Sequence, residues 1–594
     1  MQAKESNSSK HSVRHWQTVP VNEQRAEQLA AELNISLPIA VVLSSRGFEN
    51  AADAERFLNP RLSNLSDPFD LQGMDSAVSR IWQAVESGEK ITVFGDYDAD
   101  GVTGTALLVS VLRVIGGNVT FFLPNRVTDG YGLRTEPLNR CIDIHKPDLI
   151  VTVDCGTCSS DAIRSISNTN VDVVVTDHHE IAGEKAPAFS VVNPKLDDNS
   201  DTTCLAGVGV AFKLCHALIK RGMKEERKEI GTIDLRDFLD LVAIGTVADV
   251  VPLLGENRIL VKCGLMRINK AGYASESSGD VTGKKVGLDA VIKTAGISGK
   301  IDSYHIGFMI GPRVNAAGRL GDADPALELF LTTDSDRARQ LASKLEKANR
   351  ERKRIEEGIV SQALEEIEAY FDDSSDFGIV TGRKGWHTGT VGIAASRICS
   401  RYRRPTVVIG FDDHGQGRGS CRSIEGADVV CILEKCSDLL LSFGGHTMAA
   451  GLIIEEGRLE AFRKRFNELC AEKLKDCDLG GVYRVDDWIT LGEADRRLWD
   501  GIEKLGPFGF GNPAPVWGVR NVRVVGCPKL VGSGHLKMIV ASGGTQMEAI
   551  AFNMGDRQVP DAPFDIIFRL QENTYKGFSR LQLNIKDFRI AQSV

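Results

Sequence analysis

The densest group of chemically active side chains is a run of three aspartates. Asp96, Asp98 and Asp100 occupy alternate positions and are followed by Gly101. Three carboxylates this close together repel one another unless a cation neutralises them. A calcium-binding EF-hand loop would need a bidentate Glu at its twelfth position. Counted from Asp96, that position is Leu107 in a predicted helix, so a solvated turn or another kind of cation site is the better interpretation.

Further acidic and histidine side chains follow other predicted strands. Asp154 comes directly after one strand, and the triplet Asp177, His178 and His179 comes after the next. The carboxyl ends of parallel strands meet at one edge of a sheet, where ligands collect. These side chains are therefore expected to lie beside the aspartate run. Asp249, at the end of a predicted buried helix, is available to the same place.

The ligand types decide which chemistry such a group supports. Carboxylate and imidazole ligands suit Mn²⁺ or Mg²⁺ better than a metal that prefers thiolates. Two such ions about 3.5–4 Å apart hold a nucleophile and a phosphoryl oxygen together, which is the two-metal route to phosphoester hydrolysis. Each motif alone is a weak signal, whereas their recurrence at successive strand ends is a strong one.

A CxxC pair lies in the middle of this region. Cys155 and Cys158 follow Asp154 and could form a redox pair or half of a zinc site. The sequence has no second CxxC to complete a zinc site. The position beside Asp154 favours a loop whose geometry matters and whose thiols take no part.

The elements that must position these residues alternate between strands and helices. Short apolar strands separated by helix-length segments indicate a parallel sheet that is covered on both faces. A helix is expected at residues 104–116 and a buried helix at residues 234–250. The strands are predicted at residues 91–95, 119–123, 148–153 and 171–175.

Three further regions are predicted downstream. A highly charged helix over residues 334–372 is either a solvated linker or a helix that faces phosphates. A second α/β unit follows it, and after residue 478 short strands with glycine-rich turns indicate a small barrel of the OB type. The α/β unit has predicted strands at 377–381 and 405–410 and helices at 391–401 and 458–474. The barrel has predicted strands at 522–530, 535–541, 547–552, 564–570 and 581–585.

The predicted fold class is therefore α/β and multidomain. The 594 residues suffice for about three to five domains. The expected parts are an N-terminal polar and helical region (1–70), a parallel-sheet domain (71–333), a long connecting helix (334–372), a smaller α/β domain (373–477) and an OB-like β-barrel (478–594).

Composition argues against several classes of protein. The 71 Lys and Arg against 80 Asp and Glu give a net charge of −9, unlike a protein that only coats polyanions. No run reaches the ~18 uncharged apolar residues of a membrane helix, and the N-terminus lacks the apolar region of a secretory signal. The 13 cysteines are odd in number and scattered, so a disulfide framework is not expected. A cytoplasmic location without membrane association is the expectation.

The motifs resemble those of the DHH phosphoesterase superfamily, which is named for the triplet at residues 177–179. The segment 444–451 resembles the glycine-rich phosphate loop of the DHH-associated domain. Within the superfamily, the chain is similar to the RecJ family of bacterial single-strand-specific 5′→3′ DNA exonucleases. Segments 311–319 and 386–392, the length and the C-terminal β unit carry this resemblance, which extends from about residue 60 to the end.

The resemblance implies that two divalent ions, Mn²⁺ or Mg²⁺, are held by carboxylates and one imidazole. Asp154 and Asp249 would bridge the two ions. Asp96 and Asp177 would bind weakly or orient a ligand, and His179 would face the scissile phosphate. The implied ligands are Asp98, Asp100, Asp154, His178 and Asp249, with Asp96 as a weaker member.

The resemblance also implies a set of substrate contacts. Arginine presents a planar fork that suits phosphate oxygens, and the glycine-rich segment around Arg313 would let the backbone approach phosphates. His387 and His446 would help to fix the 5′ end of the strand. The implied substrate-binding residues are Arg126, Arg313, Asn315, Arg319, His387, Ser420, Arg422, Gly444, Gly445 and His446.

The implied activity is hydrolysis of single-stranded DNA from its 5′ end, in recombination and repair, by a monomer that works with a single-strand-binding protein and a helicase. The ions would lie between the DHH domain and its associated domain, and the barrel would bind the strand. One alternative is a DHH phosphodiesterase acting on short oligonucleotides or cyclic dinucleotides, against which the extra β unit argues. The other is a catalytically inactive DHH scaffold of replication, against which the intact Asp98, Asp100, Asp154 and His178 argue.

Overall fold

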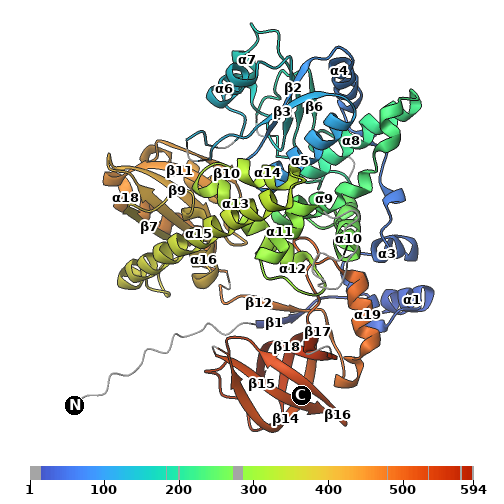
Figure 1. The fold of residues 1–594 in the computed structure, drawn as a ribbon. Coiled ribbons are helices and arrows are strands. Elements are labelled where there is room, and N and C mark those ends of the chain that lie inside the picture. The colour runs from blue at the N-terminus through green and yellow to red at the C-terminus, as the bar shows by residue number, and fades with distance from the viewer. Residues whose placement is uncertain are drawn as a thin grey trace. The chain divides into compact units, whose positions relative to one another are not determined.

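The computed structural model forms two compact units (Figure 1). The smaller unit joins the N-terminal segment up to Ser63 to the C-terminal residues from Gly480, and the larger unit comprises Asn64–Leu479. The structure describes residues 15–591 except for residues 127, 131, 182, 198–200, 272–284, 478, 533 and 576–577.

A five-stranded parallel sheet forms the first half of the larger unit, with the strand order β3-β2-β4-β5-β6. Its central strands are buried on both faces, as their runs of Val, Ile and Phe require. The predicted parallel sheet is therefore confirmed, and the short edge strand β6 is an addition to it. The strands are β2 (Lys90–Gly95), β3 (Asn118–Phe122), β4 (Leu149–Val153), β5 (Asp172–Thr176) and β6 (Ser190–Val192).

Helices flank this sheet and continue the chain beyond it (Figure 1). The helix predicted from residue 104 begins earlier, at Ala99, because the Asp98 side chain caps its first turn. The helix predicted for residues 234–250 is shorter, since a 3₁₀ turn precedes it and it ends at Ala248. The helices are α4 (Met74–Glu86), α5 (Ala99–Val114), α6 (Thr135–His145), α7 (Ser160–Ser165), α8 (Gly207–Lys224), α9 (Leu239–Ala248), α10 (Gly255–Lys270), α11 (Val286–Thr294), α12 (Ser303–His305), the π-helical turn η6 (Ile306–Ile310), α13 (Gly311–Leu320) and α14 (Asp324–Leu331).

Glycines allow helices α5, α8 and α9 and strand β4 to approach one another closely. A Cβ atom at Gly104 would lie 2.7 Å from Cγ1 of Val153 on β4. A Cβ atom at Gly245 on α9 would lie 2.3 Å from Oγ1 of Thr103 on α5. A side chain at either position would push these elements apart, so the packing requires glycine there. The close contacts bring the ends of β4 and α9 to the start of α5.

A single long helix, α15 (Ser335–Tyr370), follows these elements. Leu341 and Leu345 in its first half belong to the hydrophobic core that also contains α5 and α9. Ile359 and Ile367 in its second half belong to the core beneath the following sheet. The charged helix predicted for residues 334–372 therefore exists, but one face of it is buried along its whole length and it is not a purely solvated linker.

The second half of the larger unit is a mixed five-stranded sheet with the order β10-β11-β9-β8-β7. β7 and β8 are parallel, and the other neighbours are antiparallel. Helix α16 covers one face, and α17 and α18 cover the other. The elements are β7 (Ile379–Lys384), α16 (Val391–Tyr402), β8 (Thr406–Phe411), β9 (Gln416–Arg422), α17 (Val429–Glu434), β10 (Ser442–His446), β11 (Ala449–Glu455) and α18 (Leu459–Leu474).

The smaller unit contains a closed barrel of five strands. Strands β14-β15-β16-β18-β17 pair in this order, and β14 also pairs with β17, which closes the barrel. This confirms the predicted C-terminal barrel. The strands are β14 (Trp517–Val531), β15 (His535–Ser542), β16 (Thr545–Ala551), β17 (Phe564–Tyr575) and β18 (Phe578–Ile590), and β13 (Asp487–Trp488) extends the sheet beside β14.

The N-terminal segment packs against this barrel. Strand β1 (His15–Thr18) pairs in parallel with β12 (Val482–Val485). The three N-terminal helices and α19 (Arg496–Leu505) share one hydrophobic core with the barrel strands, in which Ile39 and Trp517 are fully buried. The sequence did not indicate this association because its partners are more than 400 residues apart in the chain. The helices are α1 (Glu23–Leu33), α2 (Leu37–Ser45) and α3 (Ala51–Leu58).

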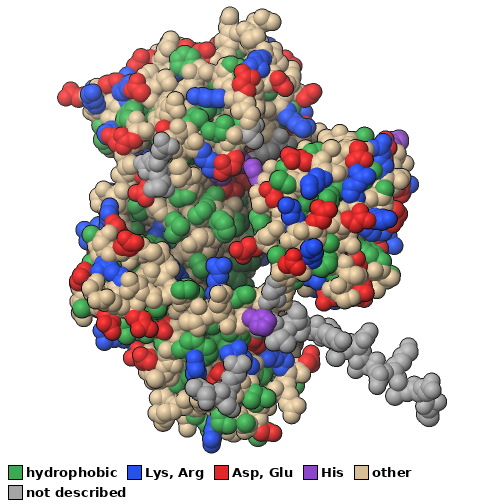
Figure 2. Space-filling view, turned by 180° about the vertical axis from the view of Figure 1, so that it is seen from behind, with side chains coloured by type: hydrophobic (Ala, Val, Ile, Leu, Met, Phe, Trp, Pro, Cys, Tyr) green, Lys and Arg blue, Asp and Glu red, His purple; other side chains and the backbone are tan. Residues whose placement is uncertain are grey.

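The surface carries both signs of charge. Lys and Arg side chains are interspersed with Asp and Glu side chains over the face shown in Figure 2. None of the helices that the structure describes combines the length and the apolar character needed to span a lipid bilayer.

The shared core of the smaller unit generates the first prediction. Ile39→Ala should destabilise the barrel by about 2–5 kcal/mol, because it leaves a cavity in a core that the barrel strands complete. Hydrogen exchange measured by mass spectrometry should show faster exchange in β14–β18 and unchanged exchange in the larger unit. Leu37→Ala on the same helix is the control, since Leu37 is 48% exposed. Unchanged exchange in the barrel of Ile39→Ala would contradict the shared core.

Candidate metal centre and phosphate contacts

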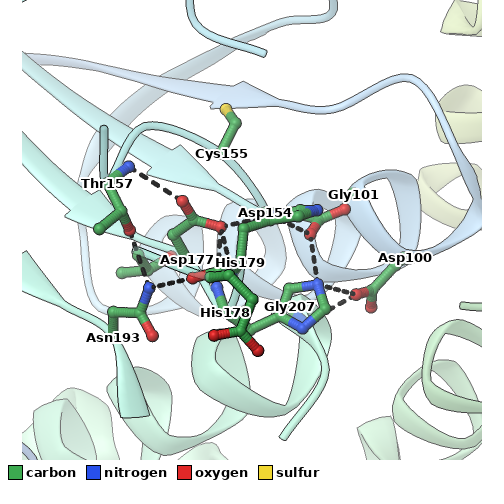
Figure 3. A network of polar contacts seen from close by, with 12 residues as sticks. Asp100, Gly101, Asp154, Cys155, Thr157, Asp177, His178, His179, Asn193 and Gly207 are labelled. Atoms are coloured by element: carbon green, nitrogen blue, oxygen red, sulfur yellow. Dashed lines mark hydrogen bonds and ion pairs between the residues drawn. The ribbon is translucent and has the colours of Figure 1, made fainter. Parts of the chain in front are cut away.

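Three neighbouring strands deliver an aspartate to one place. β2, β4 and β5 lie side by side in the sheet, and Asp96, Asp154 and Asp177 are the residues that follow them. All three side chains are buried. Asp154 has a φ of 65°, a left-handed conformation that is strained for a residue other than glycine. Such strain is characteristic of functional sites, and Figure 3 shows Asp154 between Asp177 and the start of α5.

The first turns of two helices hold the other two aspartates of the run. Asp98 caps α5, and its Oδ1 accepts hydrogen bonds from the amides of Asp100 (2.9 Å) and Gly101 (3.1 Å). The two carboxylate oxygens of Asp100 accept from the first amides of α8, Gly207 (2.6 Å) and Val208 (2.9 Å). The positive ends of both helices therefore face the carboxylates.

Asp177 fixes the histidine pair. Its Oδ1 accepts from the backbone amides of His178 (2.8 Å) and His179 (3.2 Å) and lies 2.7 Å from Nδ1 of His179, and its Oδ2 accepts from the amide of Thr157 (2.9 Å). Burial alone would raise the pKa of Asp177. The contact with His179 and the hydrogen bonds from backbone amides outweigh it and lower the pKa well below its usual value. Asn193 supports this arrangement, since its Nδ2 donates to the carbonyl of His179. Asp177 is thus a charged anchor for the ring of His179 and for the backbone amides of both histidines (Figure 3).

The ring of His178 faces three carboxylates. Its Nε2 lies 3.1 Å from Oδ1 of Asp154, 3.5 Å from Oδ2 of Asp249 and 3.8 Å from Oδ2 of Asp100. Burial, followed by the neighbouring His179, lowers the pKa of His178 to about 3. The ring is therefore neutral at physiological pH and offers a lone pair, which is the form of histidine that binds metals.

Several ligand atoms at the centre have no hydrogen-bond partner among the described residues. They are both carboxylate oxygens of Asp96, Oδ1 of Asp154 and Nε2 of His178, all of which are buried. Buried polar atoms normally have hydrogen-bond partners, so these atoms are available to bind a ligand. A divalent cation would satisfy them together.

The pKa values of the aspartates at the centre also favour a bound cation. Burial first, and then the charges of neighbouring aspartates, raise the pKa values of Asp100 and Asp154 well above their ordinary value. Burial and the charge of Asp98 also raise the pKa of Asp96 well above its ordinary value, and they raise the pKa of Asp249 to about 7. Without a counter-cation the carboxylates disfavour one another, and two divalent ions would reverse this.

The geometry supports more than one ion. Among the residues that the structure describes, three groups have ligand atoms that all lie within 4.8 Å of one another, and Asp154 and His178 each belong to two of these groups. Asp249 belongs to one group and Asp96 to another. The groups are Asp154, His178 and His179, then Asp100, His178 and Asp249, then Asp96, Asp98 and Asp154. The donors are carboxylates and imidazoles, which fit Mn²⁺ or Mg²⁺.

The CxxC pair takes no part in this arrangement. Cys155 and Cys158 are both free thiols, and Cys155 is buried whereas Cys158 is exposed. Burial, with the charges of Asp96 and Asp177, raises the pKa of Cys155 well above its ordinary value. A protonated thiol is neither a good nucleophile nor a metal ligand.

Three arginines expected to contact substrate come together beside the metal centre. The guanidinium of Arg126 lies 5.2 Å from the ring centre of Tyr97. Burial, together with the charges of Arg126 and Arg352, lowers the pKa of Arg319 to about 10. Burial lowers the pKa of Arg422 on β9, and the charge of Arg126 contributes. The structure therefore gathers guanidinium groups from both halves of the larger unit, and such a cluster favours a bound anion.

The remaining expected contacts lie on the mixed sheet and at the start of α16. Ser420, Gly451 and Gly444 are opposite one another on β9, β11 and β10, and Arg422, Ala449 and His446 form the adjacent row. These rows share one face of the sheet, because residues that are directly paired or two apart point to the same side. Nη1 of Arg422 donates to Oγ of Ser420 (2.8 Å), and Gly392 near the start of α16 lies against both.

The glycine pair and His387 are located near these rows. Gly444, Gly445 and His446 form the exposed strand β10 of a hairpin, not a free loop as the sequence suggested. His387 lies in the turn before α16, where its Nδ1 accepts from the amide of Gly389 (3.1 Å). That turn contacts α13, since Nη1 of Arg319 donates to the carbonyl of Gly389.

The segment around Arg313 differs from the sequence expectation. It forms the helix α13, so its backbone amides are directed along the helix and not into an open glycine-rich loop. Arg313 is buried in an ion pair with Glu346 on α15 (2.7 Å) and also donates to the carbonyl of Met309. Asn315 instead contacts the metal centre, because its Oδ1 accepts from the amide of Ala99 (2.6 Å). Within the segment 311–319, Arg313 therefore joins two helices, whereas Asn315 lies against the start of α5.

The sequence did not indicate that the start of α8, at Gly207 and Val208, packs against the aspartates of the centre. A Cβ atom at Gly207 would lie 2.6 Å from Cβ and 2.8 Å from Oδ1 of Asp154. The amides of Gly207 and Val208 hold Asp100 as described above. Two glycines at positions 207 and 209, at the start of an apolar helical run, were the only signal of this in the sequence.

Comparison with known proteins decides the family. The models of the DHH family N-terminal domain, the DHHA1 domain and the RecJ OB domain match residues 90–246, 375–472 and 485–587. The single-stranded-DNA-specific exonuclease RecJ of Salmonella typhimurium is 37% identical over 586 residues, covering 95% of this chain and 98% of that protein. The chain belongs to the RecJ family.

Other RecJ proteins extend the comparison to structure. The Escherichia coli RecJ exonuclease is 37% identical over 93% of this chain and 96% of its own length. The crystal structure of Thermus thermophilus RecJ in complex with Mn²⁺ has a TM-score of 0.82 and 30% identity, covering 98% of this chain and 81% of that one. A crystal structure of the same RecJ with Mg²⁺ also matches, with a TM-score of 0.75. The donor set of this chain fits both ions, as described above.

The contact between Gly207 and Asp154 generates the second prediction. Gly207→Ala should weaken Mn²⁺ binding about 10–100-fold, the range found when a residue that positions a ligand is changed, because the new methyl group displaces Asp154. Calorimetry of Mn²⁺ binding measures the effect. Gly358→Ala on α15 is the matched control, since a Cβ atom there would meet nothing within 4 Å. Equal Mn²⁺ affinity in both variants would contradict the assignment.

Proposed function

We propose that this RecJ-family chain is a single-stranded-DNA-specific exonuclease that hydrolyses phosphodiester bonds from the 5′ end with two divalent ions. The observation that carries the proposal is the convergence of buried ligand atoms without protein partners, on Asp96, Asp154 and His178. Relatives named as single-stranded-DNA-specific exonucleases match almost the whole chain, which supports the substrate class.

The two ions are assigned to the carboxylates and the imidazole at the strand ends. Bound there, they would lower the pKa of a water molecule and neutralise charge on the phosphate. Asp154 is suited to bridging them, because it belongs to two of the ligand groups, and Asp249 is the second proposed bridging residue. The proposed ligands are Asp96, Asp98, Asp100, Asp154, His178 and Asp249.

His179 is proposed to face the scissile phosphate. Asp177 fixes its ring through Nδ1 at 2.7 Å and its backbone through the amide. An aspartate that anchors an imidazole sets both its orientation and its tautomer. The ring would then contact the phosphate without side-chain reorganisation, which favours the transition state.

The arginine cluster is proposed to bind the phosphates next to the scissile bond. After burial, the positive charge of Arg126 contributes to the lowered pKa values of both Arg319 and Arg422, so the three lie within electrostatic reach, and each offers a planar fork of donors. Ser420, Gly444, Gly445, His446 and His387 would hold the terminal nucleotide at its 5′ end. These contacts use the backbone and the terminus, so cleavage should not depend on base sequence.

Strand specificity is proposed to follow from burial of the centre. Asp96, Asp100 and Asp154 are 2% exposed or less, and His178 is 7% exposed. Figure 2 shows acidic side chains and a histidine deep in a hollow of the larger unit. A single strand can thread into such a site, whereas a rigid duplex cannot bring its phosphates to the ligands.

The family resemblance supports the cellular part of the proposal. We propose a role in DNA recombination and repair, in the cytoplasm, alongside a single-strand-binding protein and a helicase. We also propose that the chain acts as a monomer, because the metal centre and the phosphate contacts come from one larger unit.

The direct test of the function is degradation of end-labelled DNA. With Mn²⁺, oligonucleotides labelled at the 5′ end should release labelled mononucleotide at once, whereas 3′-labelled ones should first yield shortened labelled products. EDTA should abolish both, and the matching duplex should resist. Early release from the 3′ label, or equal cleavage of the duplex, would overturn the proposal.

The assignment of Asp154 predicts opposite effects on stability and activity. Asp154→Ala should abolish cleavage, because the variant lacks the carboxylate that two ligand groups share. Without divalent ions its melting temperature should equal or exceed that of the wild type, since one repelling carboxylate is gone. Mn²⁺ at about 100 times its Kd should stabilise the wild type by about 2.7 kcal/mol and the variant by much less.

Thermal unfolding with and without Mn²⁺ measures these effects. Asp161→Ala, which changes an exposed aspartate on α7, is the matched control and should behave as the wild type in both tests. Near-normal turnover by Asp154→Ala at saturating Mn²⁺ would rule out the two-ion assignment.

The barrel is predicted to bind the strand away from the metal centre. A truncated chain of residues 64–479 removes the whole smaller unit, including the N-terminal helices that share the barrel core. Its KM should rise strongly for long oligonucleotides and little for very short ones, because each stacked base contributes about 1–3 kcal/mol. The salt dependence of binding should become shallower, since phosphate contacts are lost.

KM against oligonucleotide length, at two salt concentrations, measures the role of the barrel. The full chain is the reference, and kcat on a dinucleotide reports whether the larger unit is intact. An equal loss at every length would mean that the smaller unit only supports the fold.

A further inference from the structure

A pair of exposed aromatic rings lies on the helix that passes the metal centre. Tyr304 belongs to α12 and Phe308 to η6, and α12, η6 and α13 follow one another without a break. The two rings stack, with their centroids 4.8 Å apart and their planes inclined by 28°. Tyr304 is 60% exposed and Phe308 is 68% exposed. Large apolar rings that lie open to solvent beside a functional site indicate a binding surface.

The accessible face of this helix runs from the aromatic pair to the arginine cluster. Asn315 and Arg319 are four residues apart on α13, which is the spacing of one face of an α-helix, and Phe308 precedes them in the π-helical turn of the same continuous helix. Phe308 is exposed and Asn315 and Arg319 are partly buried, whereas Ile306 and Ile310, two residues to either side of Phe308, are fully buried. At about 1.5 Å per residue, Phe308 lies about 10 Å along the helix from Asn315. The aromatic pair therefore continues the line of residues that contact the metal centre.

Close packing fixes this helix against the end of α9. A Cβ atom at Gly311 would lie 3.1 Å from Cβ of Ala248, and one at Gly307 would lie 3.6 Å from Cγ1 of Val247. Ala248 directly precedes the proposed metal ligand Asp249. The π-helical turn that carries Phe308 is itself a feature common at functional sites. The rings are thus held at a set distance from the ligands.

We infer that Tyr304 and Phe308 form a stacking platform for bases of the single strand a few nucleotides from the scissile phosphate. This inference rests on the proposed exonuclease function. Stacking tolerates any sequence, because every base has an aromatic face. The ~10 Å from Asn315 along the helix corresponds to about three stacked bases at 3.4 Å each. The platform belongs to the larger unit and is separate from the barrel.

Kinetics on oligonucleotides of different length test the platform. The double variant Tyr304→Ala with Phe308→Ala should raise KM for long oligonucleotides about tenfold or more. KM for a dinucleotide, which does not reach the rings, and kcat at saturation should stay unchanged. Tyr304→Phe with Phe308→Tyr keeps both rings and should restore the wild-type KM. Ile144→Ala on α6 is the matched control, because Ile144 is 61% exposed and lies on another helix.

A scan with a single abasic nucleotide supplies the decisive measurement. In the full-length wild type, an abasic site at one or two positions a few nucleotides from the 5′ end should raise KM, and the double alanine variant should be insensitive there. The same positional sensitivity in both proteins, or an equal loss of the variant on the dinucleotide, would overturn the platform. If the wild type cleaves no DNA, the proposed function and the platform both fail. If it cleaves normally but the scan is flat, only the platform fails.

Discussion

The mutual repulsion of buried carboxylates is the constraint on which the larger unit depends. Asp96, Asp100 and Asp154 are almost fully buried, and their pKa values are raised first by burial and then by the charges of neighbouring aspartates, among which Asp98 acts on all three. Such a group is costly in a folded protein unless cations neutralise it. The neutral ring of His178 and the buried oxygens of Asp96 and Asp154 without hydrogen-bond partners are the basis for placing the proposed cations there. Binding of the metal and stability of the site are therefore coupled.

Hydrogen bonds and helix packing elsewhere in the larger unit partly stabilise the buried carboxylates and leave the ligand atoms available. The amides of α8 hold Asp100, and Asp177 supports both histidines with its own hydrogen bonds. Glycines at positions 104, 207 and 245 let the surrounding helices close around the ligands. The long helix α15 packs into both hydrophobic cores of the larger unit, so the arginine on β9 is held near those on the first half. The proposed hydrolysis then requires only that the metal ions and the DNA strand bind to this arrangement.

The sequence predicted the parts of this arrangement that repeat locally. Aspartates directly after apolar strands indicate a shared sheet edge, because the carboxyl ends of parallel strands lie at the same edge. This pattern was enough to predict that Asp154 and His178 lie at that edge. The small C-terminal barrel was predicted from five short strands with glycine-rich turns. Strands β9, β10 and β11 were missed because their glycines and polar residues weaken the strand pattern. What local patterns could not show are contacts between distant segments.

Three such contacts decide the details. The amide of Gly207 meets Asp100, Arg313 pairs with Glu346, and Ile39 packs into the barrel core, and none of these pairs is close in sequence. The sequence therefore suggested Arg313 as a substrate contact, whereas the fold uses it to join two helices. It also treated the N-terminal helices as a region apart from the barrel. Burial and partner choice are tertiary properties, and residue type alone does not encode them.

Anomalous diffraction at the manganese edge, from crystals of the protein grown with Mn²⁺, tests the central claim most directly. The account predicts two anomalous peaks about 3.5–4 Å apart, with Oδ1 of Asp154 and Nε2 of His178 within coordination distance of them. A crystal that shows no peak there in saturating Mn²⁺, with Asp154 and His178 joined by a direct hydrogen bond instead, would contradict it.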